Sequence, residues 1–416
     1  MKVYIEGYGC SLNQADTEAI ISLLKSNGFK ICEDFREADI IIINTCAVKV
    51  PTELKMLRRI KSLRNECKKA KLIVFGCLSR INPEAVRRIG KEIILVEPKL
   101  SKLCEILGIE KVEFSPNMDF EFRNKYIATI PIARGCLGNC TYCCVKNARL
   151  KLKSYPIEKI KIGVKKALQK GAKEIRLTAQ DLGCYGFDIG KNLIMLLDEI
   201  LKINGEYRIR LGMMNPYYVL GIKNELVEIL GDERVYKFLH LPLQSGSNKI
   251  LQLMKRNYSV EEFGELAKFF KKRIENISIA TDIIVGFPYE SEEDFNKSLE
   301  LIKDIKPDII NVSRYGIRPN TEAQKFEQIS EKVKKERSKI MSKLALEISY
   351  ENNKNLVGKK ERILVVEKGR KGNFIGRASN YKAIAIEKNL LGKFADVKIK
   401  KAHKCYLEGE ILKQGS

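Results

Sequence analysis

Three cysteines lie close together in the segment RGCLGNCTYC, residues 134–143 of this 416-residue chain. Three residues separate Cys136 from Cys140, and two separate Cys140 from Cys143. Thiolates with this spacing can each ligate one iron of a [4Fe–4S] cluster, and the two glycines of the segment let the backbone turn tightly around such an object. Three ligands leave the fourth iron open, which is typical of a metal site that performs chemistry rather than one that only supports the fold.

The same segment has two other interpretations, a structural zinc knuckle and a chance grouping of cysteines. A zinc knuckle needs a fourth ligand, and the segment has none at a suitable spacing. The whole chain contains only two histidines, His240 and His403, so a zinc enzyme built on imidazole ligands is disfavoured. The open-iron cluster is therefore the preferred prediction.

A second group of cysteines is spread over the first eighty residues. Cys10, Cys46 and Cys77 each come directly after a short apolar run that is predicted to be a strand. The carboxyl ends of strands in an open parallel sheet meet at one crevice, where ligands bind. A single buried free cysteine is common, but three at equivalent strand ends predict a second three-cysteine [4Fe–4S] site.

Short apolar runs alternate with helical patterns in the first hundred residues, which is typical of an open parallel sheet covered by helices. Four strands are predicted there. They cover residues 3–5, 40–43, 72–75 and 93–96. A charged, loop-like stretch over residues 113–125 then separates this unit from the next.

Six further apolar runs follow, with helical segments such as 156–169 and 192–203 between them. Six βα units in succession predict a full or partial barrel of the triosephosphate isomerase type, with its active site at the carboxyl ends of the strands. A long charged helix over residues 330–353 is predicted to connect this barrel to the remainder. The six predicted strands cover residues 127–133, 175–178, 209–212, 238–243, 277–285 and 309–313.

The last part of the chain changes to short strands separated by Gly and Asn turns, which predicts a small antiparallel β-barrel. Residues 354–416 contain 16 Lys plus Arg and 6 Asp plus Glu. This net charge of +10 favours RNA as a partner, since phosphates give affinity and exposed rings stack on bases. Filling of the barrel interior is the alternative role for its aromatic residues, which are Phe374, Tyr381, Phe394 and Tyr406. Its five strands are predicted over residues 362–367, 374–378, 383–387, 395–399 and 406–411.

Composition limits the class of protein. Apolar residues make up 44% and charged residues 31% of the chain, as in a soluble folded protein. The amino terminus has no pattern of a secretion signal and no apolar run is long enough to span a bilayer, so a cytoplasmic protein without a membrane partner is expected. The formal charge of +24 indicates a polyanionic partner such as nucleic acid, although a Lys-rich surface for solubility or heat tolerance is the alternative.

The spacing of Cys136, Cys140 and Cys143 resembles the cluster motif of the radical S-adenosylmethionine superfamily. That resemblance implies that the amino and carboxylate groups of S-adenosylmethionine chelate the open iron, and that one-electron reduction cleaves the cofactor to a 5′-deoxyadenosyl radical. The cofactor supplies the difficult chemistry, and the protein supplies position, dryness and redox potential. Cys144 directly follows the motif but breaks its spacing, so it is not counted as a ligand.

Two cysteine triplets followed by a basic barrel resemble the methylthiotransferase family over essentially the whole chain. CSLNQADTE at residues 10–18 is similar to the family's opening motif, and the basic tail resembles a TRAM RNA-binding domain. The chain looks most like the archaeal and eukaryotic branch, which methylthiolates N6-threonylcarbamoyladenosine beside the anticodon. The segments that carry this likeness are LTAQDLGCYG (177–186), LHLPLQSGS (239–247), MKRNY (254–258) and ATDIIVGFP (280–288).

The resemblance implies two [4Fe–4S] clusters, S-adenosylmethionine, a tRNA anticodon stem-loop as substrate, an external electron donor and a sulfur donor. Eukaryotic members carry a C-terminal membrane anchor, and the absence of an apolar tail before Ser416 favours the archaeal type. Isopentenyl-adenosine in tRNA or an aspartate of a ribosomal protein is the alternative target. A non-catalytic iron–sulfur protein that binds RNA is a third hypothesis.

Five residues at strand ends of the barrel are expected, by resemblance, to line the S-adenosylmethionine pocket. They are Gln180, Asp181, Gln244, Ser245 and Gly286. Asp181 and Gln244 have an alternative role as helix caps or as partners of backbone groups. The remaining cysteines are interpreted as structural or surface residues. They are Cys32, Cys67, Cys104, Cys184 and Cys405.

The predicted organisation is thus a mixed α/β protein with three domains. Residues 1–112 form an N-terminal methylthiotransferase domain with one cluster, and residues 122–353 form a radical S-adenosylmethionine barrel with its connecting helix. Residues 354–416 form the RNA-binding barrel. No acid–base or nucleophilic catalytic residue is predicted, because replacement of an unactivated aromatic hydrogen by sulfur calls for a radical.

Overall fold

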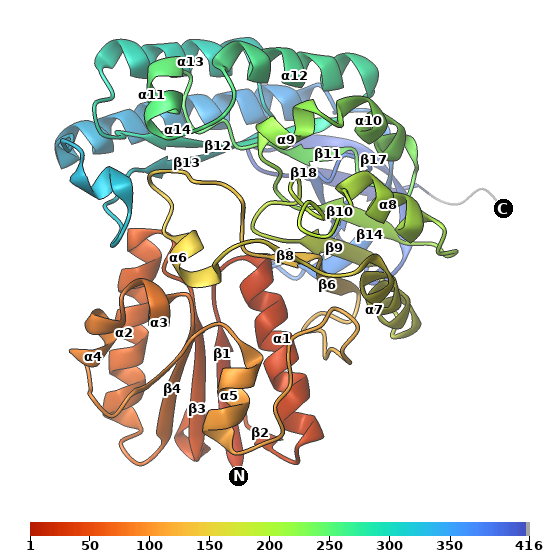
Figure 1. The fold of residues 1–416 in the computed structure, drawn as a ribbon. Coiled ribbons are helices and arrows are strands. Elements are labelled where there is room, and N and C mark those ends of the chain that lie inside the picture. Colours follow the sequence, from red (N-terminus) through yellow and green to blue (C-terminus); the bar gives the residue numbers. More distant parts are fainter. Residues whose placement is uncertain (413–416) are drawn as a thin grey trace.

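The computed structural model describes residues 1–412, so the last four residues of the predicted C-terminal barrel lie outside its described part. Figure 1 shows an N-terminal sheet with flanking helices below a larger unit of strands and helices, and a second small barrel behind the latter. This mixed α/β architecture is the predicted fold class.

The N-terminal unit is built on a five-stranded parallel sheet with the order β2-β1-β3-β4-β5. All six residues of β3 are buried, because helices cover both faces of the sheet. The four predicted strands are confirmed, and the short β2 is additional. The strands are β1 (Lys2–Gly7), β2 (Lys30–Ile31), β3 (Ile40–Thr45), β4 (Lys71–Gly76) and β5 (Ile94–Val96).

Helices on the two faces of this sheet belong to different hydrophobic clusters. Helices α1 (Ser11–Ser26) and α5 (Leu100–Leu107) pack on one face. Helices α2 (Val50–Glu66) and α3 (Leu78–Ile81) pack on the other. Short elements η1 (Phe35–Glu37) and α4 (Pro83–Arg87) complete the unit.

The predicted six-stranded barrel is confirmed as an open one. Its strands form two parallel three-stranded sheets, β10-β9-β6 and β11-β12-β13, joined by parallel bridges at Ile209–Val235 and Met213–His240. Within residues 1–412 no pairing connects β13 to β6, so the barrel is partial. The strands are β6 (Ile127–Pro131), β9 (Glu174–Thr178), β10 (Arg208–Leu211), β11 (Phe238–His240), β12 (Ser278–Val285) and β13 (Ile309–Arg314).

Helices follow the barrel strands and cover their outer side (Figure 1). Over residues 1–412, none of the helices combines the length and apolar character needed to cross a membrane. The helices are α6 (Val145–Arg149), α7 (Ile157–Gln169), α8 (Leu193–Leu201), α9 (Pro216–Leu220), α10 (Lys223–Gly231), α11 (Asn248–Leu253), α12 (Val260–Arg273), α13 (Glu292–Ile305), η2 (Glu322–Lys325) and α14 (Glu331–Lys354).

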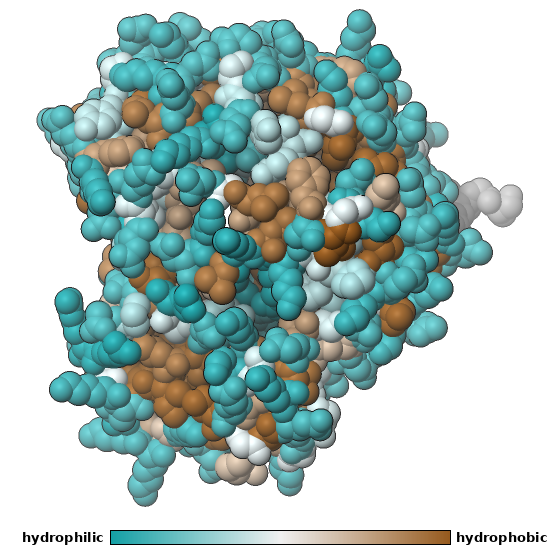
Figure 2. All heavy atoms as spheres, in the orientation of Figure 1, coloured by the Kyte–Doolittle hydropathy of each residue, from teal (hydrophilic) through white to brown (hydrophobic). Residues whose placement is uncertain are grey.

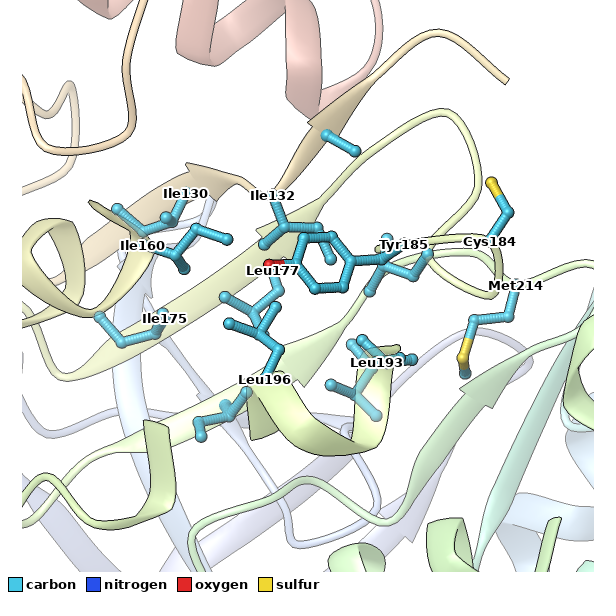
Figure 3. Close-up of a cluster of buried hydrophobic side chains, with 14 of the residues drawn as sticks. Ile130, Ile132, Ile160, Ile175, Leu177, Cys184, Tyr185, Leu193, Leu196 and Met214 are labelled. Atoms are coloured by element: carbon cyan, nitrogen blue, oxygen red, sulfur yellow. The ribbon is translucent and has the colours of Figure 1, made fainter. Parts of the chain in front are cut away.

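The interior of the barrel is mainly aliphatic and includes the fully buried ring of Tyr185. Tyr185 packs among Ile132, Leu177 and Leu193, and its hydroxyl donates to the Tyr155 carbonyl at 2.8 Å (Figure 3). In the same view Cys184 turns its sulfur away from the aliphatic side chains. Residues 181–186 are all buried, so the chain enters the core soon after β9 ends.

Residues 113–125 are irregular, as predicted, yet they do not behave as a free linker. Phe114 and Phe120 are buried in the same hydrophobic cluster as α1 and β6. Helix α1 also packs directly against β6. One continuous core therefore joins the N-terminal unit to the barrel, which fixes the two predicted cluster sites relative to each other.

Helix α14 is more than the charged connector that the sequence predicts. Its apolar side chains Met341 and Ile348 are buried against the barrel, and the helix packs along β13. Two of its charged residues are buried as well: Arg337 donates to the Glu290 carboxylate at 2.7 Å, and Lys334 packs over the Tyr315 ring. The helix therefore covers the barrel along its edge strand β13.

The C-terminal strands close into a five-stranded barrel with the order β14-β15-β16-β18-β17. The prediction of a purely antiparallel barrel is wrong in one pair, because β16 and β18 are parallel. Strand directions cannot alternate all the way around a closed barrel with an odd number of strands, so one parallel pair is unavoidable. The strands are β14 (Lys360–Lys368), β15 (Phe374–Arg377), β16 (Ala383–Ile386), β17 (Phe394–Ala402) and β18 (Leu407–Ile411).

None of the four aromatic residues of this small barrel is exposed. Phe374 is buried in its core, and Tyr381 packs on Tyr236 and Phe238 of the large barrel at centroid distances of 4.8 and 5.2 Å. The remaining two are partly buried beside charged or ring neighbours. The expectation of exposed rings for base stacking is therefore wrong for this barrel. The alternative of filling the barrel interior holds for Phe374, whereas Tyr381 packs outward on the large barrel.

Candidate metal centres

Cys10, Cys46 and Cys77 follow three neighbouring strands. Cys10 is the N-cap of α1 shortly after β1, Cys46 directly follows β3 and Cys77 directly follows β4. Since β1, β3 and β4 are adjacent and parallel, their carboxyl ends lie at one edge of the sheet. Cys10 is exposed there, whereas Cys46 and Cys77 are buried.

Asn13, in the first turn of α1, connects the loops that carry these cysteines. Its side-chain amide donates to the Tyr8 carbonyl at 3.0 Å and to the Thr45 carbonyl at 2.8 Å. Its oxygen lies 3.9 Å from the Cys77 sulfur. One buried side chain thus fixes the ends of all three strands relative to each other.

The Cys10 loop approaches Cys46 so closely that only glycine fits between them. Gly9 has φ +106°, and a Cβ at this position would lie 2.6 Å from the Cys46 Cβ. Burial raises the pKa of the Cys46 thiol to about 11, and the neighbouring thiols of Cys77 and Cys10 act in the same direction. Three thiols so close together ionise together only with a compensating cation, which a metal cluster supplies.

A cation from the barrel unit reaches this edge. Arg149, the last residue of α6, is buried, and its Nη2 lies 2.7 Å from the Asp16 carboxylate and donates to Asn13 Oδ1. Arg134 pairs with the same carboxylate. Burial raises the pKa of the Cys77 thiol, and Arg149 opposes this rise. Arg149 belongs to the barrel unit, and its positive charge favours the thiolate form of Cys77 at the N-terminal site.

The second cysteine group lies in a loop closed by a small antiparallel ribbon that the sequence did not predict. The ribbon pairs β7 (Ala133–Arg134) with β8 (Lys153–Ser154). The predicted strand 127–133 is thus interrupted after Pro131, where β6 ends. Gly135 has φ +75°, and a Cβ there would lie 2.0 Å from the Lys151 carbonyl oxygen. Glycine is therefore required at the narrow neck of the loop.

The sulfur atoms of Cys136 and Cys140 both lie near Gly138 in the loop backbone. The Gly138 amide donates to the Cys136 sulfur at 3.2 Å, and a Cβ on Gly138 would lie 3.3 Å from that sulfur and 3.8 Å from the Cys140 sulfur. Arg256 donates to the Cys140 sulfur at 3.3 Å. The Cys136 and Cys140 sulfurs therefore both lie close to Gly138, and the positive charge of Arg256 lies beside the Cys140 sulfur.

Cys143 is partly buried, as are the other two cysteines of this loop. Burial raises the pKa of its thiol to about 12, with the Cys140 thiol acting in the same direction. Thr141 holds the loop in place, since its hydroxyl donates to the Leu253 carbonyl at 2.8 Å and its amide donates to the Met254 carbonyl at 3.2 Å. The loop is thus fixed to the segment after α11.

A single metal ion does not fit either group. Within residues 1–412, no three His, Cys, Asp or Glu side chains are close enough together to hold one metal ion. A mononuclear zinc site needs ligands at about 2.0–2.3 Å from one centre, whereas a cubane cluster spreads three thiolates over three irons. The described residues therefore offer no ready-made mononuclear zinc site, and three cysteines are the usual protein ligands of a cluster with one open iron.

Gln180 and Asp181 follow β9, and the structure separates their roles. Asp181 Oδ1 accepts from the amides of Gly183 at 2.9 Å and Asn215 at 3.0 Å, and burial raises the pKa of this carboxyl to about 6. Asp181 thus organises the strand-end loops, as its alternative interpretation stated. Gln180 has a buried side-chain oxygen with no hydrogen-bond partner within residues 1–412. This free acceptor makes Gln180 the better candidate for contact with a polar cofactor.

The other three predicted pocket residues also have structural contacts. Gln244 has φ +73°, and its backbone pairs with that of β12, while its neighbour Ser245 is buried. Gly286 has φ +70°, and a Cβ there would lie 2.4 Å from the Lys334 side chain. The packing of α14 therefore explains the glycine at this position without a ligand.

Several residues of the two sites were not singled out from the sequence. Asn13 and Asp16 lie within the motif at residues 10–18, and Arg256 lies within the motif at 254–258, so the motifs contained the signal. Arg149 lies outside every motif. Its role depends on a contact between two units, which no local pattern encodes.

Cys184 lies next to the second cysteine group, although the sequence placed it among the structural residues. Its buried thiol donates to the Asp181 carbonyl at 3.4 Å, and its proximity lowers the pKa of Cys136. Cys144 is also buried, with its sulfur 3.9 Å from the Ala47 carbonyl. Both sulfurs thus have a backbone carbonyl as a hydrogen-bond partner.

We expect Cys184→Ala to retain the full iron content and the visible absorption of the reconstituted protein, because three other thiols suffice as ligands. Iron analysis after anaerobic reconstitution checks this, with Cys104→Ala as a control at another buried cysteine. A loss of about half of the iron in Cys184→Ala alone would make Cys184 a ligand and would close the open iron.

Three family models match consecutive parts of the chain. Residues 2–96 match the uncharacterized protein family UPF0004, residues 130–302 match the radical SAM superfamily and residues 354–412 match the TRAM domain. The radical SAM match contains the loop at 136–143. The UPF0004 match contains Cys10, Cys46 and Cys77. The two cysteine groups thus belong to two different matched families.

Full-length relatives decide the family. A protein from Pyrococcus horikoshii, named "probable threonylcarbamoyladenosine tRNA methylthiotransferase", is 47% identical over 99% of this chain and 100% of its own length. The threonylcarbamoyladenosine tRNA methylthiotransferase of Homo sapiens is 35% identical over 98% of this chain and 74% of its own length. The chain belongs to this methylthiotransferase family.

Solved structures show the same fold for this methylthiotransferase family member. The radical S-adenosylmethionine methyltransferase TsrM from Kitasatospora setae matches with a TM-score of 0.59 and 14% identity over 78% of this chain and 77% of its own. The cobalamin-dependent S-adenosylmethionine radical enzyme OxsB matches with a TM-score of 0.53 and 12% identity over 82% and 55%. At these identities the likeness concerns the fold alone.

Proposed function

We propose that this chain is a tRNA methylthiotransferase that converts N6-threonylcarbamoyladenosine next to the anticodon into its 2-methylthio derivative. The observation that carries the proposal is the presence of two separate cysteine triplets at strand ends within one continuous core. The names of the full-length relatives support the threonylcarbamoyl base as the target.

Each triplet is proposed to hold one [4Fe–4S] cluster. Cys10, Cys46 and Cys77 hold the cluster that receives sulfur, while the loop cysteines hold the cluster that binds S-adenosylmethionine. When bound, these groups supply a one-electron route to replace an unactivated aromatic hydrogen by sulfur, followed by methyl transfer. The free oxygen of Gln180 supports a polar contact to S-adenosylmethionine, with Asp181, Gln244, Ser245 and Gly286 around it.

The chain itself contributes position and charge. Arg149 and Arg256 lie beside the two sets of thiols and compensate negative charge when the thiols are ionised. The hydrogen bonds of Asn13 and Thr141 hold the two ligand loops in fixed positions. Fixed loops would hold the thiol ligands of a bound cluster in place.

The proposal assigns residues 1–112 to the sulfur-cluster domain, 122–353 to the radical domain and 354–416 to the RNA-binding barrel. The matched families support this division, since each lies inside one of the three ranges. An external electron donor and a sulfur donor complete the reaction. A cytoplasmic location follows from the tRNA substrate.

Mass spectrometry of tRNA nucleosides tests the function. The purified enzyme, reconstituted anaerobically with a reductant, S-adenosylmethionine and threonylcarbamoylated tRNA, should form 2-methylthio-N6-threonylcarbamoyladenosine. The same assay with isopentenyl-adenosine tRNA or a ribosomal protein tests the two alternative targets. A protein that never cleaves S-adenosylmethionine in any of these mixtures would instead be the non-catalytic RNA-binding protein.

The small barrel should bind phosphates rather than stack on bases, because none of its four rings is exposed. We expect the triple change Lys388→Gln, Lys393→Gln and Lys398→Gln to weaken tRNA binding and to reduce the log–log salt slope by about 0.7 for each phosphate that is no longer neutralised. The three lysines are exposed and form no ion pair within residues 1–412. Binding measured over a range of salt concentrations checks this.

Neutralisation is preferable to deletion of the barrel, because the barrel is docked on the core. Deletion would also remove the buried Lys382–Asp308 pair at 2.8 Å and the Tyr381 packing. The matched control is Lys332→Gln, Lys335→Gln and Lys339→Gln on the exposed side of α14. Equally weakened binding in both triple variants would mean that the small barrel makes no specific contact with RNA.

A further inference from the structure

A basic cavity of about 390 Å³ lies between the N-terminal unit and the barrel. It is bounded by α5 on one side and by the α6–β8 segment on the other; Figure 1 draws α5 in orange and α6 in yellow. Figure 2 shows hydrophilic side chains around the hollow on this face. Seven of the residues that line the cavity are Lys or Arg, and only two are Glu.

Most of these cations are already paired with carboxylates. Lys99 lies 3.0 Å from Glu97, and both arginines of the cavity pair with Asp16. Lys151 and Lys153 differ, because they are exposed and form no ion pair within residues 1–412. Two uncompensated ammonium groups on a concave basic surface favour a polyanion.

Exposed aromatic rings lie on the neighbouring loops of the barrel. The Phe187 side chain is 52% exposed and the Tyr217 side chain 46% exposed, although large aromatic rings normally avoid water. Tyr218 stands between them, with ring centroids at 5.5 Å from Phe187 and 5.2 Å from Tyr217. The three rings form an aromatic ledge (Phe187, Tyr217 and Tyr218).

The ledge borders the predicted S-adenosylmethionine site. A Cβ on Gly183 would lie 2.9 Å from the Tyr218 Cβ and 3.3 Å from the Asp181 carboxylate. Cys184, next to Gly183 in the chain, donates to the Asp181 carbonyl at 3.4 Å. A base that stacks on the ledge therefore lies next to the loop of the second cysteine group.

Strand β8 joins the ledge to the cavity. The Ser154 amide donates to the Asp188 carboxylate at 2.8 Å, and the Gly186 amide donates to the Ser154 hydroxyl at 2.9 Å. Lys153 precedes Ser154 in β8, and Phe187 lies between Gly186 and Asp188. The free cations and the exposed rings are thus held by one rigid connection.

We propose that the cavity and the ledge form one RNA-binding track, in which backbone phosphates lie against Lys151 and Lys153 and an unpaired base next to the target stacks on Phe187 and Tyr217. This inference rests on the proposed tRNA substrate and specifies where its single-stranded loop lies. Phosphate attraction supplies salt-dependent affinity, and ring stacking contributes about 1–3 kcal/mol per base regardless of sequence. The small barrel, which has none of its four rings exposed, supplies only charge.

Binding of an anticodon stem-loop RNA of about 17 nucleotides to the full-length reconstituted protein tests the cationic half of the track. Lys151→Gln/Lys153→Gln should lower the log–log salt slope by about 0.7 for each phosphate that is no longer neutralised, and the control Lys335→Gln/Lys339→Gln should leave it unchanged. An unchanged salt slope in Lys151→Gln/Lys153→Gln, or an equal change in this variant and the control, would overturn the proposed phosphate contacts of Lys151 and Lys153.

Loss of base stacking on Phe187 and Tyr217 should change the affinity for RNA without changing its salt dependence. Phe187→Ala/Tyr217→Ala should weaken binding by about tenfold or more with the salt slope retained, while Phe187→Tyr/Tyr217→Phe, which keeps both rings, should bind as the parent protein does. Equal binding by the alanine and ring-retaining variants would overturn the proposed stacking. Formation of the methylthio nucleoside by the parent protein is measured in parallel, so the track can fail while the proposed function stands.

Discussion

Cys140→Ala is expected to abolish formation of 5′-deoxyadenosine and to remove about half of the iron from the reconstituted protein. The cluster in the 136–143 loop then has two thiolates in place of three, and Arg256 loses the sulfur to which it donates at 3.3 Å. The N-terminal cysteines lie in a different unit and keep their own hydrogen bonds through Asn13. Iron analysis and chromatography of the cofactor products measure the two effects.

The residue after the motif offers a matched control for this change. Cys144→Ala removes a buried thiol whose sulfur lies 3.9 Å from the Ala47 carbonyl. We expect this variant to retain iron and cofactor cleavage. Cleavage activity with full iron content in Cys140→Ala would refute the assignment of the loop cysteines to the radical cluster.

Short-range patterns predicted most strands because buried parallel strands are continuous apolar runs. Residues 40–45 illustrate this: the run of four isoleucines and the two polar residues after it form the central strand β3. Strand β2 was missed, because its two residues show no periodicity and depend on pairing with β1. The ribbon of β7 and β8 was missed for the same reason.

Charge patterns were less informative than apolar ones. Lys334 and Arg337 gave α14 the pattern of a solvated connector, yet both are buried where the helix covers the barrel. The two side chains can be buried because each has a partner. Arg337 pairs with the Glu290 carboxylate, and the Lys334 ammonium group lies over the Tyr315 ring. Such partners lie far away in the sequence and on other elements, so a local charge count does not find them.

The positions of the candidate ligands were predictable, whereas their surroundings were not. Cys10, Cys46 and Cys77 could be placed together because the ends of neighbouring parallel strands always meet. Arg149 could not, since its contact with Asp16 joins α6 to α1 across the unit boundary. The rings of the small barrel were misplaced for a related reason, because their partners on the large barrel appear only in three dimensions.

The two clusters should be separable by mutation, and Cys46→Ala is the change that separates them. We expect this variant to keep reductive cleavage of S-adenosylmethionine but to form no methylthiolated nucleoside. Cys46 follows β3 and is buried at the edge of the N-terminal sheet, whereas the loop cysteines are fixed by Thr141 to the segment after α11. Removal of one ligand at the first site leaves those contacts in place.

A merely structural role for the N-terminal cysteines predicts a different result, in which the protein unfolds and both activities disappear together. Cys104→Ala provides the comparison, because Cys104 is fully buried in α5 of the same unit and belongs to neither cysteine group. Circular dichroism of both variants checks the fold, and one anaerobic reaction gives both products. Cys46 is one of three neighbouring thiols, whereas Cys104 lies among aliphatic side chains. Only Cys46→Ala should therefore uncouple cofactor cleavage from methylthiolation.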